Sequence, residues 1–373
     1  MAIYKIFPQQ DNFIFTQVVT ANAGKDEILE IGGYEIRNIG QASRALLQFK
    51  STEISDIVDN KIGSNNYSAS LEMKIASAYE TPFTHSVESF PLAESWEPGL
   101  GKFADDILTG SADKSGCSWR YRKANQVDSW TLESFTALTT GSYSSTYPGG
   151  GVWYTGSSGI NLKATQSFEP NGDLDIDINV TEAVKLHKAG TIANNGFVVK
   201  FTDDLEFLPS QSIIHKYYSA DTNTIYPPTL TFKWDDSSYD TGSLSVLNNS
   251  EAIIQVTNNA GEYADEGKAR FRLLARPKNP TRTFVTASLY KTNYALPSGS
   301  YYALQDEFTE ELEIPFNTTF TKISCDSTGP FLDLYLDGLQ PERHYRLLIK
   351  STLDGSTSIV KSDVFKVVRN AGI

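Results

Sequence analysis

The sequence predicts an all-β protein of two domains, and three observations carry this prediction. Aromatic residues make up 12% of the chain, with 19 Tyr and 20 Phe against 2 Met, and such side chains fit the half-buried surface of a sheet. Short clusters of Gly, Ser, Thr, Asn and Asp separate short apolar segments, as in strands joined by turns. A length of 373 residues predicts two domains, since domains usually have about 100–200 residues.

Strand patterns run through residues 1–234, which we expect to form the first domain. Residues 27–31 alternate between polar and apolar, and residues 43–49 form a mostly apolar run typical of a core strand. Helical spacing is found instead at residues 52–60, behind a Thr cap, and at residues 181–188. Further strands are expected at residues 1–20, 71–77, 173–178, 196–201 and 227–234.

A long polar stretch at residues 95–165 interrupts the strands and predicts a set of long loops. Its aromatic side chains allow three interpretations: they fill a core beneath the loops, they anchor a protein interface, or they stack on sugar rings. The residues singled out as interface or glycan contacts are Trp119, Trp130, Trp153 and Tyr154. Residues 148–151 (PGGG) predict a mobile loop tip.

The polar, turn-rich residues 235–242 predict a linker, followed by a second domain at residues 243–373. Strand patterns separated by about 8–15 residues are typical of a β-sandwich. We expect these strands at residues 252–256, 270–275, 283–289, 311–314, 331–336, 345–350 and 364–368.

Charge and cysteine content exclude several classes of function. The formal net charge is −13 without any Lys/Arg-rich run, which disfavours a nucleic-acid partner. Cys117 and Cys325 lie too far apart in sequence to suggest a disulfide framework or a thiolate metal site, and indicate folding in a reducing cytoplasm. We find no secretory signal and no apolar stretch long enough to insert into a membrane.

Only weak candidates for chemistry remain, and we predict no catalysis and no cofactor. Asp173, Asp175 and Asp177 would share one face of a strand and offer oxygen ligands for calcium, although a solvated strand face is the simpler interpretation. The four histidines lack ligand spacing and no nucleophile elbow occurs. A carboxylate pair for glycoside hydrolysis needs no sequence proximity, so it stays open.

Residues 1–234 resemble the jelly-roll module named for its Asp-Asn-Arg-Leu-Arg-Glu signature, which is found in cell-surface and carbohydrate-associated proteins. The matching segments are residues 22–24, 43–49, 95–99, 179–184 and 194–199. The signature itself is absent from this chain. The resemblance implies a jelly-roll β-sandwich for the first domain.

The second domain is similar to fibronectin type III and immunoglobulin-like sandwiches through its residues 339–345 (LQPERHY). The resemblance implies a corner motif made by Leu339, Pro341 and Tyr345, in which the Tyr hydroxyl bonds back to the upstream backbone.

A further resemblance covers most of the chain. The opening residues 1–11, the run at 43–49 and residues 217–228 (YYSADTNTIYPP) look like virion structural proteins of T4-like myoviruses that infect marine cyanobacteria. This implies a location in the virion and contacts with other virion proteins. The leading prediction is therefore a non-catalytic bacteriophage structural protein of the tail, neck or baseplate, working in an oligomer. A module that binds host-surface glycan is the alternative, and a glycan hydrolase comes third.

Overall fold

The chain is all-β and forms two compact units in a computed structural model. The structure describes residues 2–36, 39–79, 81, 83–104, 112–130, 149–157, 159–207, 212–281 and 289–370. The N-terminal unit comprises Ile6–Lys61 and Ser68–Thr231, and the C-terminal unit comprises Met1–Lys5, Ile62–Tyr67 and Phe232–Ile373.

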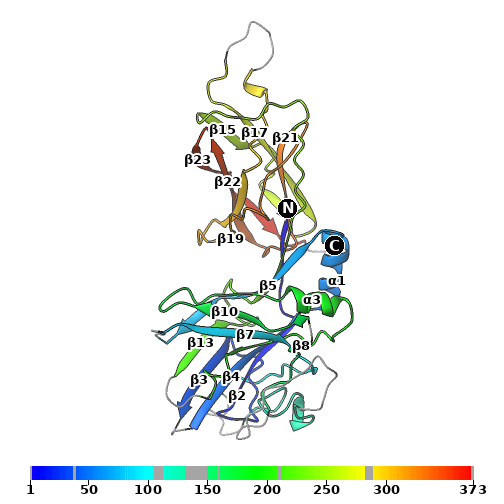
Figure 1. Cartoon of the computed structure of the whole chain (residues 1–373), viewed down its shortest axis with the longest axis vertical. Helices are drawn as coiled ribbons and strands as arrows, with labels where there is room; N and C mark the ends of the chain where they lie inside the picture. Colours follow the sequence, from blue (N-terminus) through cyan, green and yellow to red (C-terminus); the bar gives the residue numbers. More distant parts are fainter. Residues whose placement is uncertain are drawn as a thin grey trace. The chain divides into compact units, whose positions relative to one another are not determined.

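An antiparallel sheet in the order β10-β7-β12-β4-β3-β13-β6 forms the body of the N-terminal unit (Figure 1). A further strand, β2 (Gln10–Phe15), pairs with β4. The bounds of the seven are β3 Ile28–Ile36, β4 Ile39–Gln48, β6 Ile75–Ala78, β7 His85–Pro91, β10 Ala164–Phe168, β12 Phe197–Phe201 and β13 Ile213–Tyr218.

A second sheet has the order β1-β14-β5-β11, and the division between the units falls within β1, β5 and β14. Its strands are β1 Ala2–Ile6, β5 Tyr67–Met73, β11 Ile176–Asn179 and β14 Thr229–Trp234. The two short strands β8 (Gly156–Ser157) and β9 (Ile160–Asn161) form a hairpin of their own.

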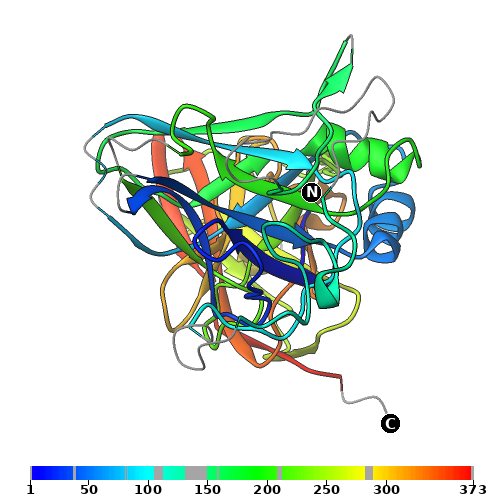
Figure 2. The same ribbon diagram turned by 90° about the horizontal axis from the view of Figure 1, so that it is seen from below.

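Both predicted helices are present, and the first of them has changed limits. Helix α3 spans Thr181–Lys188 as predicted, and α1 spans Ser51–Asp56 before a π-helical turn, η1, at Ile57–Ile62. The N-cap of α1 is Lys50 and has no side-chain capping bond, so the predicted Thr cap is wrong. Figure 2 shows α1 and α3 side by side, in agreement with their contacts.

Both faces of the large sheet are buried along β4, which explains the mostly apolar run in this strand. Because successive side chains of a strand point to opposite faces, Ala45 and Leu47 lie on one face while Arg44 and Leu46 lie on the other, and all four are 0–1% exposed. The face of Leu46 packs in one core cluster with four loop tryptophans, among them Trp96.

Two further segments of the N-terminal unit differ from the expectation. The predicted strand at residues 173–178 is shorter, because Asp173 Oδ1 accepts a bond from the Asp175 amide at 3.0 Å and turns the chain before β11 begins at Ile176. Of the predicted loop tip at residues 148–151, the described part, Gly149–Gly151, is buried and so does not project from the unit. Pro148 lies outside the described residues.

The C-terminal unit is a sandwich of two sheets with the orders β15-β17-β21-β20 and β16-β24-β22-β18-β19. The first comprises β15 Ala252–Val256, β17 Lys268–Pro277, β20 Ser324–Asp326 and β21 Gly329–Tyr335. The second comprises β16 Glu262–Ala264, β18 Tyr301–Asp306, β19 Leu312–Ile314, β22 Arg343–Leu353 and β24 Phe365–Val368, while β23 Ser356–Lys361 pairs with β22. Side chains such as Phe271, Tyr302 and Leu347 from both sheets form the core between them.

Residues 235–242 are not a free linker. The amide of Cys325 donates to the Ser238 carbonyl at 2.9 Å, and the amide of Asp240 donates to the Cys325 carbonyl at 3.0 Å. This segment is therefore bonded to β20 of the C-terminal unit. Of the strand predicted at residues 283–289, only Leu289 is described, and it begins the 3-10 turn η3 (Leu289–Lys291). A short 3-10 turn, η2, also spans Ala124–Gln126.

Candidate functional site

A group of charged side chains is buried on the loop-covered face of the large sheet. Lys200 on β12 lies directly opposite Glu88 on β7, and its Nζ is 3.7 Å from Glu88 Oε2 and 3.5 Å from Glu206 Oε2. Arg44 on β4 binds the same Glu206. These four residues, which we call the ion cluster, are each 4% exposed or less.

Arg44 holds the ion cluster together. Its Nε and Nη2 donate to the two oxygens of Glu206 at 2.8 and 2.7 Å, the bidentate geometry that suits guanidinium and carboxylate best. The guanidinium carbon also lies 4.7 Å from the ring centre of Trp119 and 5.1 Å from that of Trp153, distances at which a cation is attracted to an aromatic face. Nη1 donates to the Gly150 carbonyl at 2.5 Å.

The backbone at Gly150 is built to accept this contact. Gly150 has a φ of +85°, and a Cβ there would lie 2.5 Å from Arg44 Nη1 and 2.6 Å from a ring atom of Trp119. Its amide donates to the Trp119 carbonyl at 2.6 Å. Only glycine fits both the conformation and the space. Arg44 and Gly150 therefore fasten the loop at 149–153 to the sheet, and we call this arrangement the Arg44 clamp.

The charges of the ion cluster balance, and this limits its chemistry. Arg44 and Lys200 face Glu88 and Glu206, while Lys200 also donates to Asp203 at 2.7 Å and Lys163 pairs with Glu88. A glycosidase needs two carboxyl groups facing a substrate across a groove. Here both glutamates are buried and bound to cations, so the arrangement favours a structural role.

The predicted interface or glycan residues lie mostly in the interior. Trp119 is 1% exposed, Trp153 3% and Trp130 6%, and the Trp130 indole donates to the Ser118 carbonyl at 2.9 Å. Of the three interpretations, a place in the core beneath the loops is the one that fits these rings. Tyr154 is half-buried, and this burial raises the pKa of its phenol.

The acidic residues proposed as a weak calcium site do not converge. Asp175 is bound to the Ile75 amide at 2.9 Å and to Lys74 at 2.6 Å, whereas Asp177 points to solvent. Asp173 caps the turn before β11. Within the described ranges, no three His, Cys, Asp or Glu side chains are grouped as they would be around a metal.

Two histidines that spacing did not single out meet inside the N-terminal unit. The rings of His85 on β7 and His215 on β13 have centres 4.9 Å apart. Four strand spacings, about 19 Å in a flat sheet, separate β7 from β13, so the sheet must curve like half a barrel. Only this curvature brings together residues that are 130 positions apart.

The tautomer of both histidines follows from their partners. His85 Nδ1 lies 3.1 Å from the Phe83 carbonyl, which can only accept. His215 Nδ1 lies 3.1 Å from the Tyr217 hydroxyl, which itself donates to the Leu174 carbonyl. Both Nδ1 atoms therefore carry the proton. Burial lowers the pKa of His85 and lowers that of His215 to about 3, so both rings are neutral.

The corner residues lie in the C-terminal unit. Tyr345 is buried on β22, and its hydroxyl donates to the Gln340 carbonyl at 3.0 Å. This is the bond that the corner motif predicts. Leu339 belongs to the same core cluster as Tyr345, whereas Pro341 lies between them in the turn that precedes β22.

Comparison of the chain with protein-family models, with curated proteins and with solved structures found no match. Among the helices of the described residues, none has the length and apolar character needed to cross a membrane.

Proposed function

We propose that this chain is a non-catalytic structural protein of a bacteriophage particle, located in the tail, neck or baseplate and acting through contacts with other virion proteins. The observation that carries the proposal is the Arg44 clamp. In this clamp, the buried charged and aromatic side chains of the unit fix a long loop to a sheet. A rigid, loop-covered sheet suits a building block of an assembly.

The resemblances noted in the sequence supply the setting. A jelly-roll-like body followed by a fibronectin- or immunoglobulin-like sandwich gives an N-terminal unit for assembly contacts and a C-terminal unit for spacing or attachment. The acidic net charge of −13 keeps such a subunit soluble before assembly. Localisation in the virion and oligomerisation within it belong to the same proposal.

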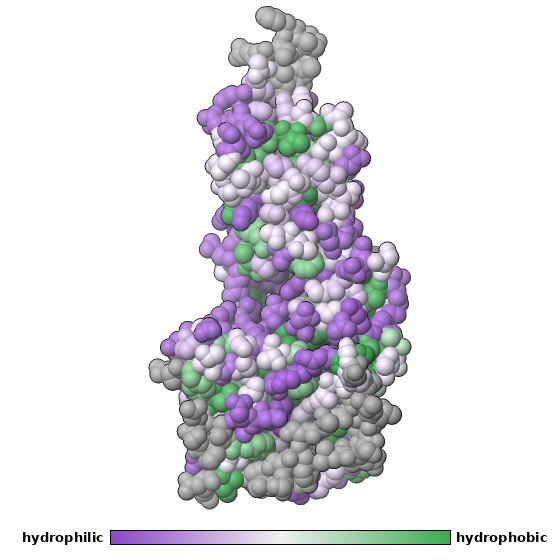
Figure 3. All heavy atoms as spheres, in the orientation of Figure 1, coloured by the Kyte–Doolittle hydropathy of each residue, from purple (hydrophilic) through white to green (hydrophobic). Residues whose placement is uncertain are grey.

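We keep the stretch at residues 95–165 as the proposed contact surface. The contacts would be made by exposed apolar residues and not by the buried tryptophans. Leu100 is 70% exposed and Val127 is 55% exposed. Figure 3 shows mainly hydrophilic residues on the visible face, with hydrophobic residues in small groups. We take Leu100 and Val127 as the side chains that a partner would bury.

The test is to locate the chain and then disturb its proposed contacts. Immunogold labelling with an antibody against the purified chain should mark one site on intact particles. Leu100→Asp and Val127→Asp should fold normally by circular dichroism and enter particles at reduced copy number. Lys102→Asp, an exposed charge in the same stretch, is the matched control for the added carboxylate. Unlabelled particles, or normal incorporation of both apolar variants, would contradict the proposal.

The glycan-binding alternative loses the support that it drew from the tryptophans, because indoles this deeply buried cannot stack on a sugar without opening the core. Binding of the purified chain to host-surface polysaccharide, combined with normal incorporation of both apolar variants, would favour this alternative over assembly contacts.

A further inference from the structure

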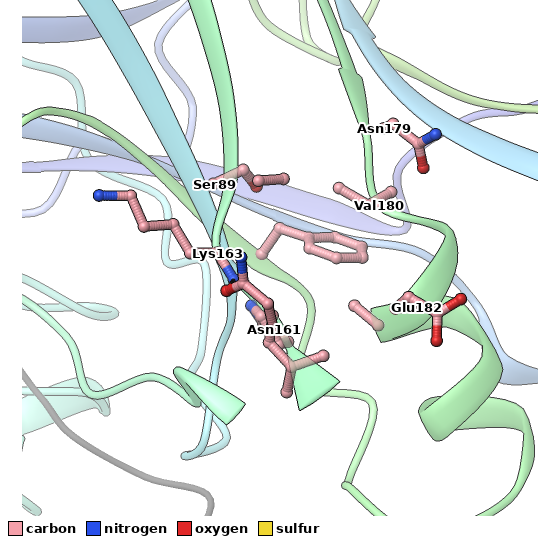
Figure 4. Close-up of a pocket in the computed structure, with 11 residues that line it drawn as sticks. Ser89, Asn161, Lys163, Asn179, Val180 and Glu182 are labelled. Atoms are coloured by element: carbon pink, nitrogen blue, oxygen red, sulfur yellow. Dashed lines mark hydrogen bonds between the residues drawn. The ribbon is translucent and has the colours of Figure 1, made fainter. Parts of the chain in front are cut away.

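A small pocket opens in the N-terminal unit between β7, β9, β10 and the start of α3 (Figure 4). Its volume is about 70 Å³. Liquid water occupies about 30 Å³ per molecule, so the pocket has room for a few covalently joined heavy atoms and not for a whole ring. Most of its wall is apolar, and the residues that matter below are Ser89, Asn161, Leu162, Val180, Ala183 and Phe197.

Ser89 supplies an unused polar group to this pocket. Alternation along β7 directs Ser89 to the face opposite Glu88 and the ion cluster. Its Oγ is buried and has no hydrogen-bond partner among the described residues. A buried hydroxyl without a partner is unfavourable. An occupant that offers a hydrogen-bonding atom would remove this penalty.

The charges at the rim are already satisfied, which favours a neutral occupant. Lys163 pairs with Glu88, and Glu182 accepts from Lys185 at 2.9 Å. Figure 4 shows the side chains of Lys163 and Glu182 extending away from the pocket. The side-chain Oδ1 of Asn179 accepts from the amide and the hydroxyl of Thr181, the first residue of α3. The Asn161 Oδ1 atom accepts from the Lys163 amide at 3.0 Å. The Ser89 hydroxyl and the side-chain NH₂ groups of Asn161 and Asn179 are then the polar groups left for a ligand.

We propose that this pocket binds the acetamido group of an N-acetylated sugar. The group is neutral, has four heavy atoms, and joins a methyl to a hydrogen-bonding amide. The methyl would pack against Val180 and Ala183, and the amide oxygen would accept a bond from the Ser89 hydroxyl. The sugar ring would remain at the mouth, beside the Asn161 side chain. This inference goes beyond the proposed structural role and does not depend on it.

The test uses the full chain with N-acetylglucosamine as the probe and glucose as the control sugar. Saturation-transfer NMR should show the acetyl methyl protons as the most strongly saturated, with a dissociation constant of about 1 mM, as expected for a ligand held through one small group. Ser89→Ala should weaken binding about fivefold, the usual effect of one neutral hydrogen bond. Ala183→Leu should fill the pocket and abolish binding.

Ser86→Ala is the matched control, since it removes a hydroxyl from the opposite face of the same strand, where Ser86 bonds Ser167. It should bind like the natural chain. Melting curves check that each variant folds, and if Ala183→Leu does not fold, Ser89→Ala and glucose decide. Absence of saturation with N-acetylglucosamine, equal binding of glucose, or unchanged binding by Ser89→Ala would overturn the proposal.

Discussion

Tyr345 allows the stability contribution of a single hydrogen bond in the C-terminal unit to be measured. The phenol lies in the core and its hydroxyl donates to the Gln340 carbonyl. Tyr345→Phe keeps the ring and removes only this bond, so we expect a loss of about 0.5–1.5 kcal/mol in the free energy of unfolding. Urea unfolding followed by fluorescence measures it. Tyr290→Phe is the control, because Tyr290 is 58% exposed; equal losses for both would contradict a special role of the corner.

The buried histidines make stability depend on pH. Burial lowers the pKa of His215 to about 3 and that of His187 to about 4, and it also lowers that of His85. The unfolded chain therefore binds more protons below about pH 6.5, where its histidines titrate. The contribution of these histidines to the free energy of unfolding should be fully present above that pH. It should fall as the pH drops toward 4, by up to about 1.4 kcal/mol per pH unit for each histidine.

Asp11 acts in the opposite direction in part of this range. Burial raises the pKa of its carboxyl to about 6, so the folded state takes up a proton there as the pH falls from about 6 to about 4. Unfolding free energies at about pH 7 and about pH 5 test the balance. His215→Phe should reduce the pH dependence and Asp11→Asn should steepen it. Identical pH profiles for the natural chain and both variants would show that other groups control acid stability.

The positions of individual side chains were the least predictable part of this sequence. Trp119 and Trp153 are buried because a loop folds back on a sheet face that already carries Arg44, and no local pattern reports such tertiary cover. The same holds for His85 and His215, whose meeting depends on sheet curvature. Tyr345 was predictable because its partner lies only five residues away.

At the scale of elements, the sequence patterns identified some segments and missed others, among them the largely buried strands β7, β13 and β18. Helix α3 and strand β15 have the predicted limits. Strand β23 was missed because it pairs only with β22 and is exposed along most of its length, so alternation is absent. The length of the strand predicted at residues 173–178 was overestimated at its start. There the Asp175 amide donates to the Asp173 side chain instead of to a neighbouring strand.

The Arg44 clamp joins β4 to the loop at 149–153, and its contribution can be measured. Arg44→Met leaves Glu206 buried without its main partner, so we expect a loss of about 3–5 kcal/mol, the usual cost of breaking a buried ion pair. Glu206→Gln in the same chain should recover part of that loss, because no uncompensated carboxylate remains. A double-mutant cycle in urea gives the coupling energy. Lys25→Met, which breaks an exposed pair with Asp221, is the control and should cost at most about 1 kcal/mol.

At the scale of the whole molecule, the described residues form one core cluster around the tryptophans of the N-terminal unit and a separate one around Tyr345 of the C-terminal unit. Units with their own cores can unfold independently. We expect calorimetry to resolve two transitions, one lowered by Arg44→Met and the other by Tyr345→Phe, with little effect of either variant on the remaining transition. In the double variant, the melting temperature of each transition should fall by the sum of the changes that the two single substitutions cause in it, since the effects of distant sites are usually additive. A single transition shifted by each variant would mean that the two units unfold as one cooperative structure.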